Sequence, residues 1–305
     1  DFSGGFILVN TKDVPSSNLF TISVGTSLND QTHFKKFLYN KGSGTDFLGF
    51  DNGFRSLKGG INAVLSPMNN GYDLLNNGLN NDWTVKDRRP LADLSLNMNF
   101  SRRWVDSSGR TLAILGTVNY SNSYRTYLDM DNNLFGAYDM THDCSNYLRK
   151  SIDDQYNHSV RIGTMLNFTY IPASGNSRYE FKNIFNQLGK DRYTYRKGTD
   201  AQSDYEESAE YYYQSRTTYN GQFTGKHTLG NTDKLDWSAG YSYANRNMPD
   251  RRRYTTVLNE ETNQLEVENL NEINREFSRL DEHILSANIN YQHDFSFLSL
   301  IHISE

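Results

Sequence analysis

Residues 234–246, KLDWSAGYSYANR, alternate between mostly large apolar side chains and small or polar ones. Leu235, Trp237, Ala239, Tyr241 and Tyr243 occupy every second position. Successive side chains of a β-strand point to opposite faces of the sheet, so this pattern predicts a strand with one aromatic face and one polar face. An aromatic face of this kind packs against a protein core or faces lipid. The lengths of the strands and loops and the composition distinguish the two settings.

The same alternation recurs in seven other segments, and no part of the chain shows a convincing helical period. Most of these segments are roughly ten residues long, which is the length that a tilted strand needs to cross a bilayer. The other predicted strands cover residues 20–24, 92–100, 112–120, 160–170, 179–185, 211–223 and 285–291.

The connections between these strands alternate in length. Three are short and rich in turn residues, at 105–109, 171–176 and 229–233. Short turns on one side and long loops on the other are typical of outer-membrane barrels, whereas a soluble β-sandwich has no reason to sort its loops in this way. The long polar segments predicted as external loops are 28–90, 123–156, 196–209 and 247–275.

Composition supports the same architecture. The mean hydropathy is -0.74, and no run of 18 apolar residues is present, so a helical membrane protein is excluded. Aromatic residues nevertheless make up 13% of the chain, which is unlike a disordered polar chain. A transmembrane barrel combines both properties, because its outer face is apolar while its lumen and loops are polar.

The charge and cysteine content exclude other classes. A net charge of -5 and the absence of a repeated basic stripe argue against a nucleic-acid partner. The single Cys144 excludes a disulfide framework within the chain. The sequence opens without the features of a signal peptide, and we expect the chain to be a fragment of a longer protein.

Aromatic side chains gather towards the ends of the predicted strands. Tyrosine and tryptophan prefer the membrane–water interface, where the ring lies in the apolar layer and the polar atom in water. We therefore interpret the aromatic face as facing lipid. The predicted lipid-facing girdle consists of Phe20, Phe100, Tyr120, Phe168, Tyr170, Tyr179, Phe181, Trp237, Tyr241, Tyr243 and Tyr291.

Four stretches resemble a known family. GGFILVNTKDVP (4–15) resembles the end of the plug domain of TonB-dependent outer-membrane receptors. Residues 18–57 resemble the first barrel strand and first loop of such receptors in Bacteroidetes, and TDFLGFDNGFRSL (45–57) is the most particular part of this stretch. NIFNQLGKDRYTYR (183–196) and KLDWSAGYSYANRNMPDRRR (234–253) resemble later strands and loops of the same group. The resemblance extends from about residue 4 to about residue 293.

The resemblance implies an all-β fold, an antiparallel transmembrane β-barrel of 22 strands with a plug, of which this chain would hold about eight strands. Residues 1–16 would be the C-terminal end of the plug and 17–297 the N-terminal part of the barrel. The tail LSLIHISE (298–305) fits no strand of the family, and we expect it to be non-native. Eight strands of a larger barrel leave two unpaired edges.

The resemblance also implies a function and a location. Such a receptor lies in the outer membrane of a Gram-negative bacterium, contacts lipid and lipopolysaccharide, and couples to the TonB complex through a region N-terminal to this chain. It imports a scarce solute, and the sequence leaves open whether this is a siderophore, haem, cobalamin, a glycan or a peptide. A passive porin and a soluble or surface-attached, glycan-binding β-rich protein remain the alternatives.

Few residues suggest chemistry of their own. No nucleotide-binding, hydrolase or zinc-protease motif is present, so we expect neither an enzyme nor a cofactor. We expect no metal at His142-Asp143-Cys144, because adjacent residues rarely converge on one ion. We expect none in the stretch from Asp129 either, because Leu134 and Met140 replace the glycine and glutamate of a calcium loop.

Two groups of charged residues are candidates for contacts. Arg251, Arg252 and Arg253 form either a solvated charge run or a contact with lipopolysaccharide phosphates, because guanidinium forks match phosphate geometry. The second group occupies the polar face of the predicted strands, where mixed charges pair across strands or meet a plug. Its members are Arg161, Glu180, Lys182, Arg216 and Asp236.

Overall fold

The computed structural model describes residues 14–57, 79–267 and 273–295. These residues form one antiparallel sheet of ten strands and a separate pair of short strands, which confirms the all-β, antiparallel fold class. The sheet is not closed into a barrel. Its eight long strands are β1 (Leu19–Ser27), β4 (Asp93–Val105), β5 (Thr111–Asp131), β7 (Cys144–Ile171), β8 (Ser177–Asp200), β9 (Tyr205–Leu229), β10 (Asp233–Asn259) and β12 (Asn274–His293).

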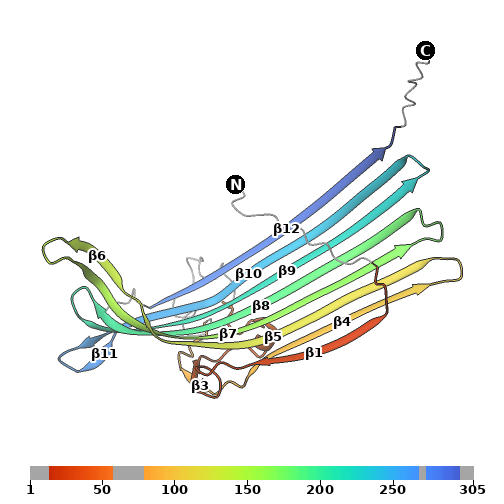
Figure 1. Ribbon diagram of the computed structural model, residues 1–305. Coiled ribbons are helices and arrows are strands. Elements are labelled where there is room, and N and C mark those ends of the chain that lie inside the picture. The colour runs from red at the N-terminus through yellow and green to blue at the C-terminus, as the bar shows by residue number, and fades with distance from the viewer. Residues whose placement is uncertain (1–13, 58–78, 268–272, 296–305) are drawn as a thin grey trace, which may run out of the picture.

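Each long strand pairs with the next one along the chain. The order across the sheet is β1, β4, β5, β7, β8, β9, β10 and β12, with the short β6 (Leu134–Asp139) on β7 and β11 (Gln264–Glu266) on β10. The strand ends follow an arc in Figure 1, so the sheet is curved. Among the described residues, β1 and β12 have a long partner strand on one side only, as predicted for the two edges.

The three short connections form tight turns at one end of the sheet (Figure 1). Each contains a glycine with a left-handed backbone: Gly109 at φ 84°, Gly175 at φ 70° and Gly230 at φ 74°. A side chain is disfavoured in that conformation, which explains the choice of residue. All eight predicted strands are present, and the turns at 105–109, 171–176 and 229–233 separate them as expected.

The strands are longer than the sequence predicted. The segments expected as loops at 123–156, 196–209 and 247–275 are largely strand, because β5, β7, β8, β9 and β10 continue through them. The prediction relied on apolar residues at every second position, and that pattern fades where both faces carry polar side chains. The backbone ladder does not need it: β8 and β9 stay in register from Ser177↔His227 to Thr199↔Tyr205.

The segment predicted as the first loop, 28–90, contains little regular structure in its described part. It holds β2 (Phe37–Tyr39) and β3 (Lys86–Arg88), which pair with each other, and the 3-10 turn η1 (Asp46–Leu48). No helix among the described residues is long and apolar enough to cross a membrane. Most of the predicted plug end (1–16), residues 58–78 of this loop and the tail 298–305 lie outside the described residues.

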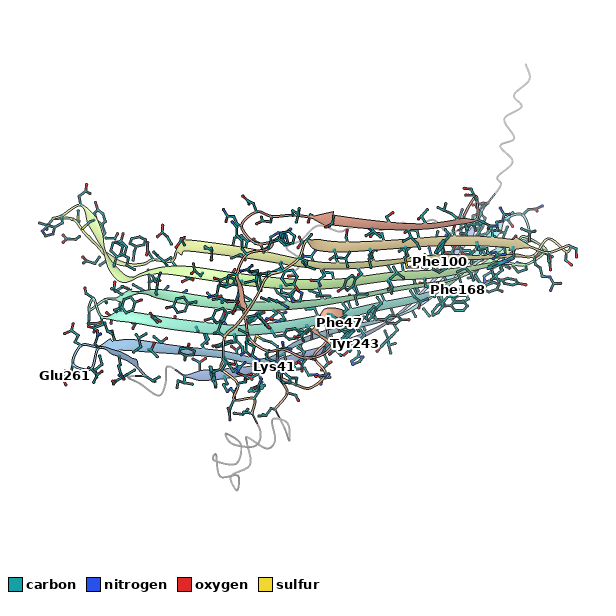
Figure 2. All side chains as sticks on the ribbon, turned by 90° about the horizontal axis from the view of Figure 1, so that it is seen from below. Lys41, Phe47, Phe100, Phe168, Tyr243 and Glu261 are labelled. Carbon is teal, nitrogen blue, oxygen red and sulfur yellow. The ribbon has the colours of Figure 1, made fainter. Side chains whose placement is uncertain are left out.

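The described residues of 28–57 and 79–92, which we call the covering segment, lie across one face of the sheet (Figure 2). Phe37 is its central residue and is 1% exposed. Its ring meets the rings of Tyr124 and Tyr156 edge-on, at centroid distances of 5.4 and 5.5 Å. Tyr193 and Tyr211 complete this buried cluster, which fixes the segment on β7, β8 and β9.

Two glycines let the covering segment approach the sheet closely. Gly49, at the end of η1, has φ 77°, and its carbonyl accepts a hydrogen bond from Gln187 Nε2 at 2.5 Å. A Cβ placed on Gly189 would lie 2.5 Å from the Cα of Gly49, which is too close for two carbon atoms. Backbone therefore packs on backbone at this point, and neither residue tolerates a side chain without movement.

We predict that Gly189→Ala weakens the docking of the covering segment by about 1–3 kcal/mol, the usual range for overpacking a close contact. Hydrogen exchange at the amides of Leu48 and Gly49, which bond to Thr45 and Asp46, would report the loss. Gly163→Ala on β7 is the matched control, since a methyl group there meets only the side chains of Asn186 and Asn119. Equal protection in both variants would contradict this role of Gly189.

Candidate functional site

The pairing register divides the sheet into two faces. Side chains alternate along a strand, and directly paired residues of antiparallel strands lie on the same face. One face carries Phe100, Phe168 and Trp237, and we call it the apolar face; the opposite one carries Arg161 and Arg216, and we call it the polar face. Figure 2 looks onto the apolar face, where Phe100, Phe168 and Tyr243 are labelled.

All eleven residues of the predicted girdle lie on the apolar face. The pairs Phe20↔Phe100, Phe168↔Phe181 and Tyr170↔Tyr179 link β1 to β4 and β7 to β8 directly. The remaining members are paired with residues of the same face. These pairs are Tyr120↔Ile162, Trp237↔Gly225, Tyr241↔Gly221, Tyr243↔Tyr219 and Leu235↔Tyr291. Several stay accessible within the described structure: Phe20 is 63% exposed and Phe181 42%.

A row of rings crosses four strands close to the tight turns. Tyr170 and Tyr179 stack at 6.4 Å, Tyr179 meets His227 at 5.4 Å, and His227 stacks on Trp237 at 6.4 Å. Trp237 Nε1 donates a hydrogen bond to His227 Nε2 at 3.0 Å. Each of these side chains combines an apolar ring with a polar atom, which is the chemistry suited to the boundary between an apolar layer and water.

At the end away from the tight turns, the exposed part of the apolar face stops where the covering segment begins to cover it. On β5 the Tyr120 hydroxyl donates to the Phe47 carbonyl at 3.0 Å, and on β8 Gln187 bonds to Gly49. The open part of the apolar face, which we call the apolar band, therefore runs on β8 from Tyr179 to Gln187. That length is roughly 27 Å of strand, or about 19–22 Å of height at the usual strand tilt of about 35–45°.

Buried charges lie where the covering segment meets the apolar face, with Arg55 on the segment and Asp191 on β8. Arg55 is paired with Asp46 at 2.6 Å and with Asp51 at 2.8 Å, and its guanidinium lies 4.0 Å from the centre of the Tyr213 ring. Burial raises the pKa of Asp191 to about 6, although the charge of Arg55 opposes this. The carboxyl of Asp191 therefore titrates close to neutrality.

His158 lies next to this cluster and is neutral. Burial, together with the charge of Arg88, lowers the pKa of His158 to about 3. Its ring stacks on Tyr124 at 4.3 Å, and its Nε2 lies 2.8 Å from Asn122 Oδ1, so Nε2 carries the proton that is donated. The imidazole acts as a packed aromatic side chain, and protonation would cost stability.

The three consecutive arginines do not form one surface. Arg252 is 4% exposed and lies on the apolar face, where it donates to the Asp82 carbonyl and to Asn40 Oδ1, both at 2.7 Å. Arg251 and Arg253 are on the polar face, where Arg251 pairs with Glu210 at 2.5 Å. Of the three candidates for lipopolysaccharide contact, Arg252 instead fixes the covering segment, and only Arg253 is exposed.

The polar face brings the other predicted charged residues together. Arg161, Glu180, Lys182, Arg216 and Asp236 all lie on it. Glu180 is 4% exposed and pairs with Lys182 at 3.0 Å and with Arg178. Further along the strands, Asp153 pairs with Arg196 at 2.7 Å and Glu210 with Arg192 at 2.6 Å. Most carboxylates of this face are therefore matched with a cation.

The residues considered as metal ligands make only local contacts. His142 Nδ1 lies 2.6 Å from Asp139 Oδ2, and Asp143 is bonded to Tyr138. Cys144 is exposed. Within residues 14–57, 79–267 and 273–295, no group of three or more His, Cys, Asp or Glu side chains is placed to hold a metal ion.

Sequence reasoning missed the docking of the covering segment and the residues that hold it. Tyr193, Tyr211 and Tyr213 alternate in phase with the residues of the apolar band, and this was the available signal that the apolar face continues beyond it. Arg252 could have been separated from its neighbours by the same alternation. No protein-family model, curated protein or solved structure matches the chain.

We predict that Arg252→Gln weakens the docking of residues 79–84 by about 2–3 kcal/mol. The change removes the bonds to Asp82 and Asn40 and leaves Asp250, which is 4% exposed, with Arg275 as its remaining ion-pair partner. Hydrogen exchange over 79–88 measures the effect. Arg253→Gln, at an exposed neighbouring position, should change it by less than about 0.5 kcal/mol. Equal effects of the two substitutions would refute the distinction.

A second prediction concerns pH. Asp191, with a raised pKa, contributes stability at low pH that is lost as the pH rises through about 6; His158, with a lowered pKa, contributes stability above its ordinary pKa that is lost as the pH falls. The two effects oppose each other between pH 6.5 and 5. We therefore expect docking of the covering segment to change little over this range in the natural sequence.

Asp191→Asn should expose the effect of His158. Docking of the variant should be stronger than that of the natural sequence at pH 7 and should weaken by about 1–2 kcal/mol between pH 6.5 and 5. His158→Asn should show the reverse slope and strengthen over the same range. Hydrogen exchange at Leu48 and Gly49, corrected for the intrinsic pH dependence of exchange, gives these values. Parallel profiles for all three proteins would contradict the assignment.

Proposed function

We propose that this chain forms part of the wall of an outer-membrane β-barrel that imports a scarce solute, in the manner of the TonB-dependent receptors that it resembles. The observation that carries the proposal is the apolar band. It lies on one face of an antiparallel sheet, its height of about 19–22 Å approaches the roughly 25 Å apolar band of outer-membrane barrels, and its opposite face is polar.

The exposed side chains of the band favour lipid over water. On β1 and β12, Val24 is 69% exposed, Leu285 83% and Ile289 77%. A soluble protein rarely exposes a continuous apolar surface of this extent, since its transfer to an apolar environment is favourable by about 25 cal/mol for each Å². Paired strands also satisfy the backbone groups that a bilayer cannot hydrogen-bond.

The ends of the band support the same placement. Tyr170, Tyr179 and Trp237 lie at the end with tight turns, which is the periplasmic end in such barrels. At the other end, the covering segment lies on the apolar face where the strands would emerge from the membrane. Arg253, exposed beyond this level, is the member of the arginine run available to lipopolysaccharide phosphates.

The polar face supports transport rather than catalysis. Its charged side chains line grooves that would face a water-filled or plugged lumen, as the interior of large barrels does. The resemblance of residues 4–15 to the end of a plug favours an energised receptor over a passive porin. The partners that follow are membrane lipid, lipopolysaccharide, the TonB complex and the imported solute.

The three tryptophans provide the test. Trp104 and Trp237 lie on the apolar face near the tight turns, whereas Trp83 lies in the covering segment against Tyr211. We predict that a detergent with brominated acyl chains quenches the fluorescence of Trp104 and Trp237 strongly and that of Trp83 weakly. Three variants that each keep one tryptophan, with the others replaced by phenylalanine, separate the signals in micelles of the full chain.

Micelles of the same detergent without bromine are the control. Detergent covers the apolar band whether or not the edges of the sheet are paired, so the test is independent of barrel closure. Equal, weak quenching at all three positions would show that protein buries this face. That outcome would favour the soluble, glycan-binding alternative and reject the membrane proposal.

A further inference from the structure

Two arginines on the polar face stand opposite each other without a carboxylate between them. Arg216 of β9 pairs directly with Arg246 of β10, and Arg161 of β7 belongs to the same row, because Arg161 and Arg216 both pair with Leu188. Like charges in direct cross-strand register destabilise a sheet. The row therefore needs a reason other than the stability of the sheet.

A buried glutamine holds this pair in place. With the amide of Gln214 oriented to satisfy its neighbours, its oxygen accepts from Arg216 Nε at 2.6 Å and from Arg246 Nε at 2.9 Å. Gln214 is 7% exposed and its amide nitrogen faces the Tyr212 hydroxyl. A neutral side chain thus orients both guanidiniums without cancelling their charge, and both arginines remain exposed.

The row lines a groove with an excess of positive charge. The groove has a volume of about 660 Å³ and is lined by Arg161, Lys190, Arg192, Arg216, Arg246 and Arg251, with Glu276 as its lining carboxylate. Glu210 and Glu276 pair with Arg192 and Arg251. For the other four cations, no carboxylate of the described residues lies within ion-pair distance. This differs from the matched pairs elsewhere on the polar face, such as Asp153 with Arg196.

We propose that this groove binds a polyanionic solute that carries two or more phosphate or carboxylate groups. Neighbouring strands are about 4.8 Å apart, so Arg216 and Arg246 can hold one anionic group between them, while Arg161 lies roughly 10 Å from Arg216 and can hold a second. Lys190, on the strand between Arg161 and Arg216, adds a further positive charge. The inference rests on the proposed function, since it places the groove on the lumen side and names the chemical class of the cargo.

Binding can be measured with two simple probes. Inorganic tripolyphosphate and citrate, titrated calorimetrically into the full chain in detergent micelles, represent the phosphate and carboxylate forms of the ligand. Arg216→Gln combined with Arg246→Gln should weaken binding of the preferred probe by about 100-fold, because each charge-assisted contact contributes roughly tenfold. The preferred probe then identifies which anionic group the groove selects.

The control removes the same charge from another part of the polar face. Lys226→Gln combined with Lys234→Gln deletes two cations near the tight turns, and it should leave binding within about threefold. Equal weakening in both double variants would mean that the probes sense only overall charge, and would overturn the proposal. Absence of binding of both probes to the natural sequence would also overturn it. If the full chain binds an acidic peptide but neither tripolyphosphate nor citrate, the groove is a binding site for a protein segment, and the proposal of a small polyanionic solute is overturned.

Thermal unfolding distinguishes a binding role of Arg216 and Arg246 from a structural one. If the two arginines stabilised the sheet, replacing them would lower the melting temperature. Removing the facing charges should leave the melting temperature of the Arg216→Gln, Arg246→Gln variant unchanged or raised, and a lower melting temperature would reject the proposal. The result is separate from the tryptophan quenching test. Anion binding without quenching would reject the membrane wall but keep the site, and quenching without anion binding would do the reverse.

Discussion

The structure depends on the register between its long strands, which is uninterrupted across the apolar band. A slip of one residue would move every side chain of a strand to the opposite face. Phe181 and Phe223 are directly paired on the apolar face, and Glu180 and Thr224 beside them on the polar face. The register shifts between long strands lie beyond the apolar band, at Tyr127/Met130 on β5 and, on β10, at Asn247/Arg252 against β9 and Met248/Arg251 against β12. The separation of apolar and polar chemistry is therefore a property of the backbone ladder.

The apolar face is covered by the covering segment over part of its length and is exposed over the rest, the apolar band. Val160 and Tyr193 are buried, on strands that lie beneath the covering segment, whereas Leu166 and Phe181 in the band remain exposed. The boundary is the backbone contact of Gly49 with Gly189 and the hydrogen bond from Gln187. In the proposed membrane setting, this boundary marks where lipid ends. The buried charges around Arg55 and Asp191 then lie outside the apolar layer, where their pairing partners can be supplied by the covering segment.

Alternation predicted the eight long strands and the common face of all eleven aromatic residues, and short runs of turn residues predicted the tight turns. The alternation stopped at residue 185 on β8, because Gln187, Gly189 and Asp191 interrupt the apolar members of that face, although Tyr193 and Tyr195 resume it in phase. The alternation pattern also could not predict the docking of the covering segment. Contacts such as Phe37 with Tyr156 join residues more than a hundred positions apart, and no local pattern encodes them. The run of three arginines was treated as one surface, although strand alternation places Arg252 on the opposite face from Arg251 and Arg253.

A spin-label scan along β8 is the most direct test of whether the apolar band faces lipid. Single cysteines at each position from 179 to 195, with Cys144 replaced by serine, would report collisions with oxygen, which concentrates in lipid, and with a polar nickel complex, which stays in water. If the apolar band faces lipid, labels at odd positions from 179 to 185 will collide more with oxygen and labels at even positions more with the nickel complex. From 187 the odd positions should be shielded from both reagents by the covering segment. Equal nickel access at odd and even positions from 179 to 185 would show that the band does not face lipid.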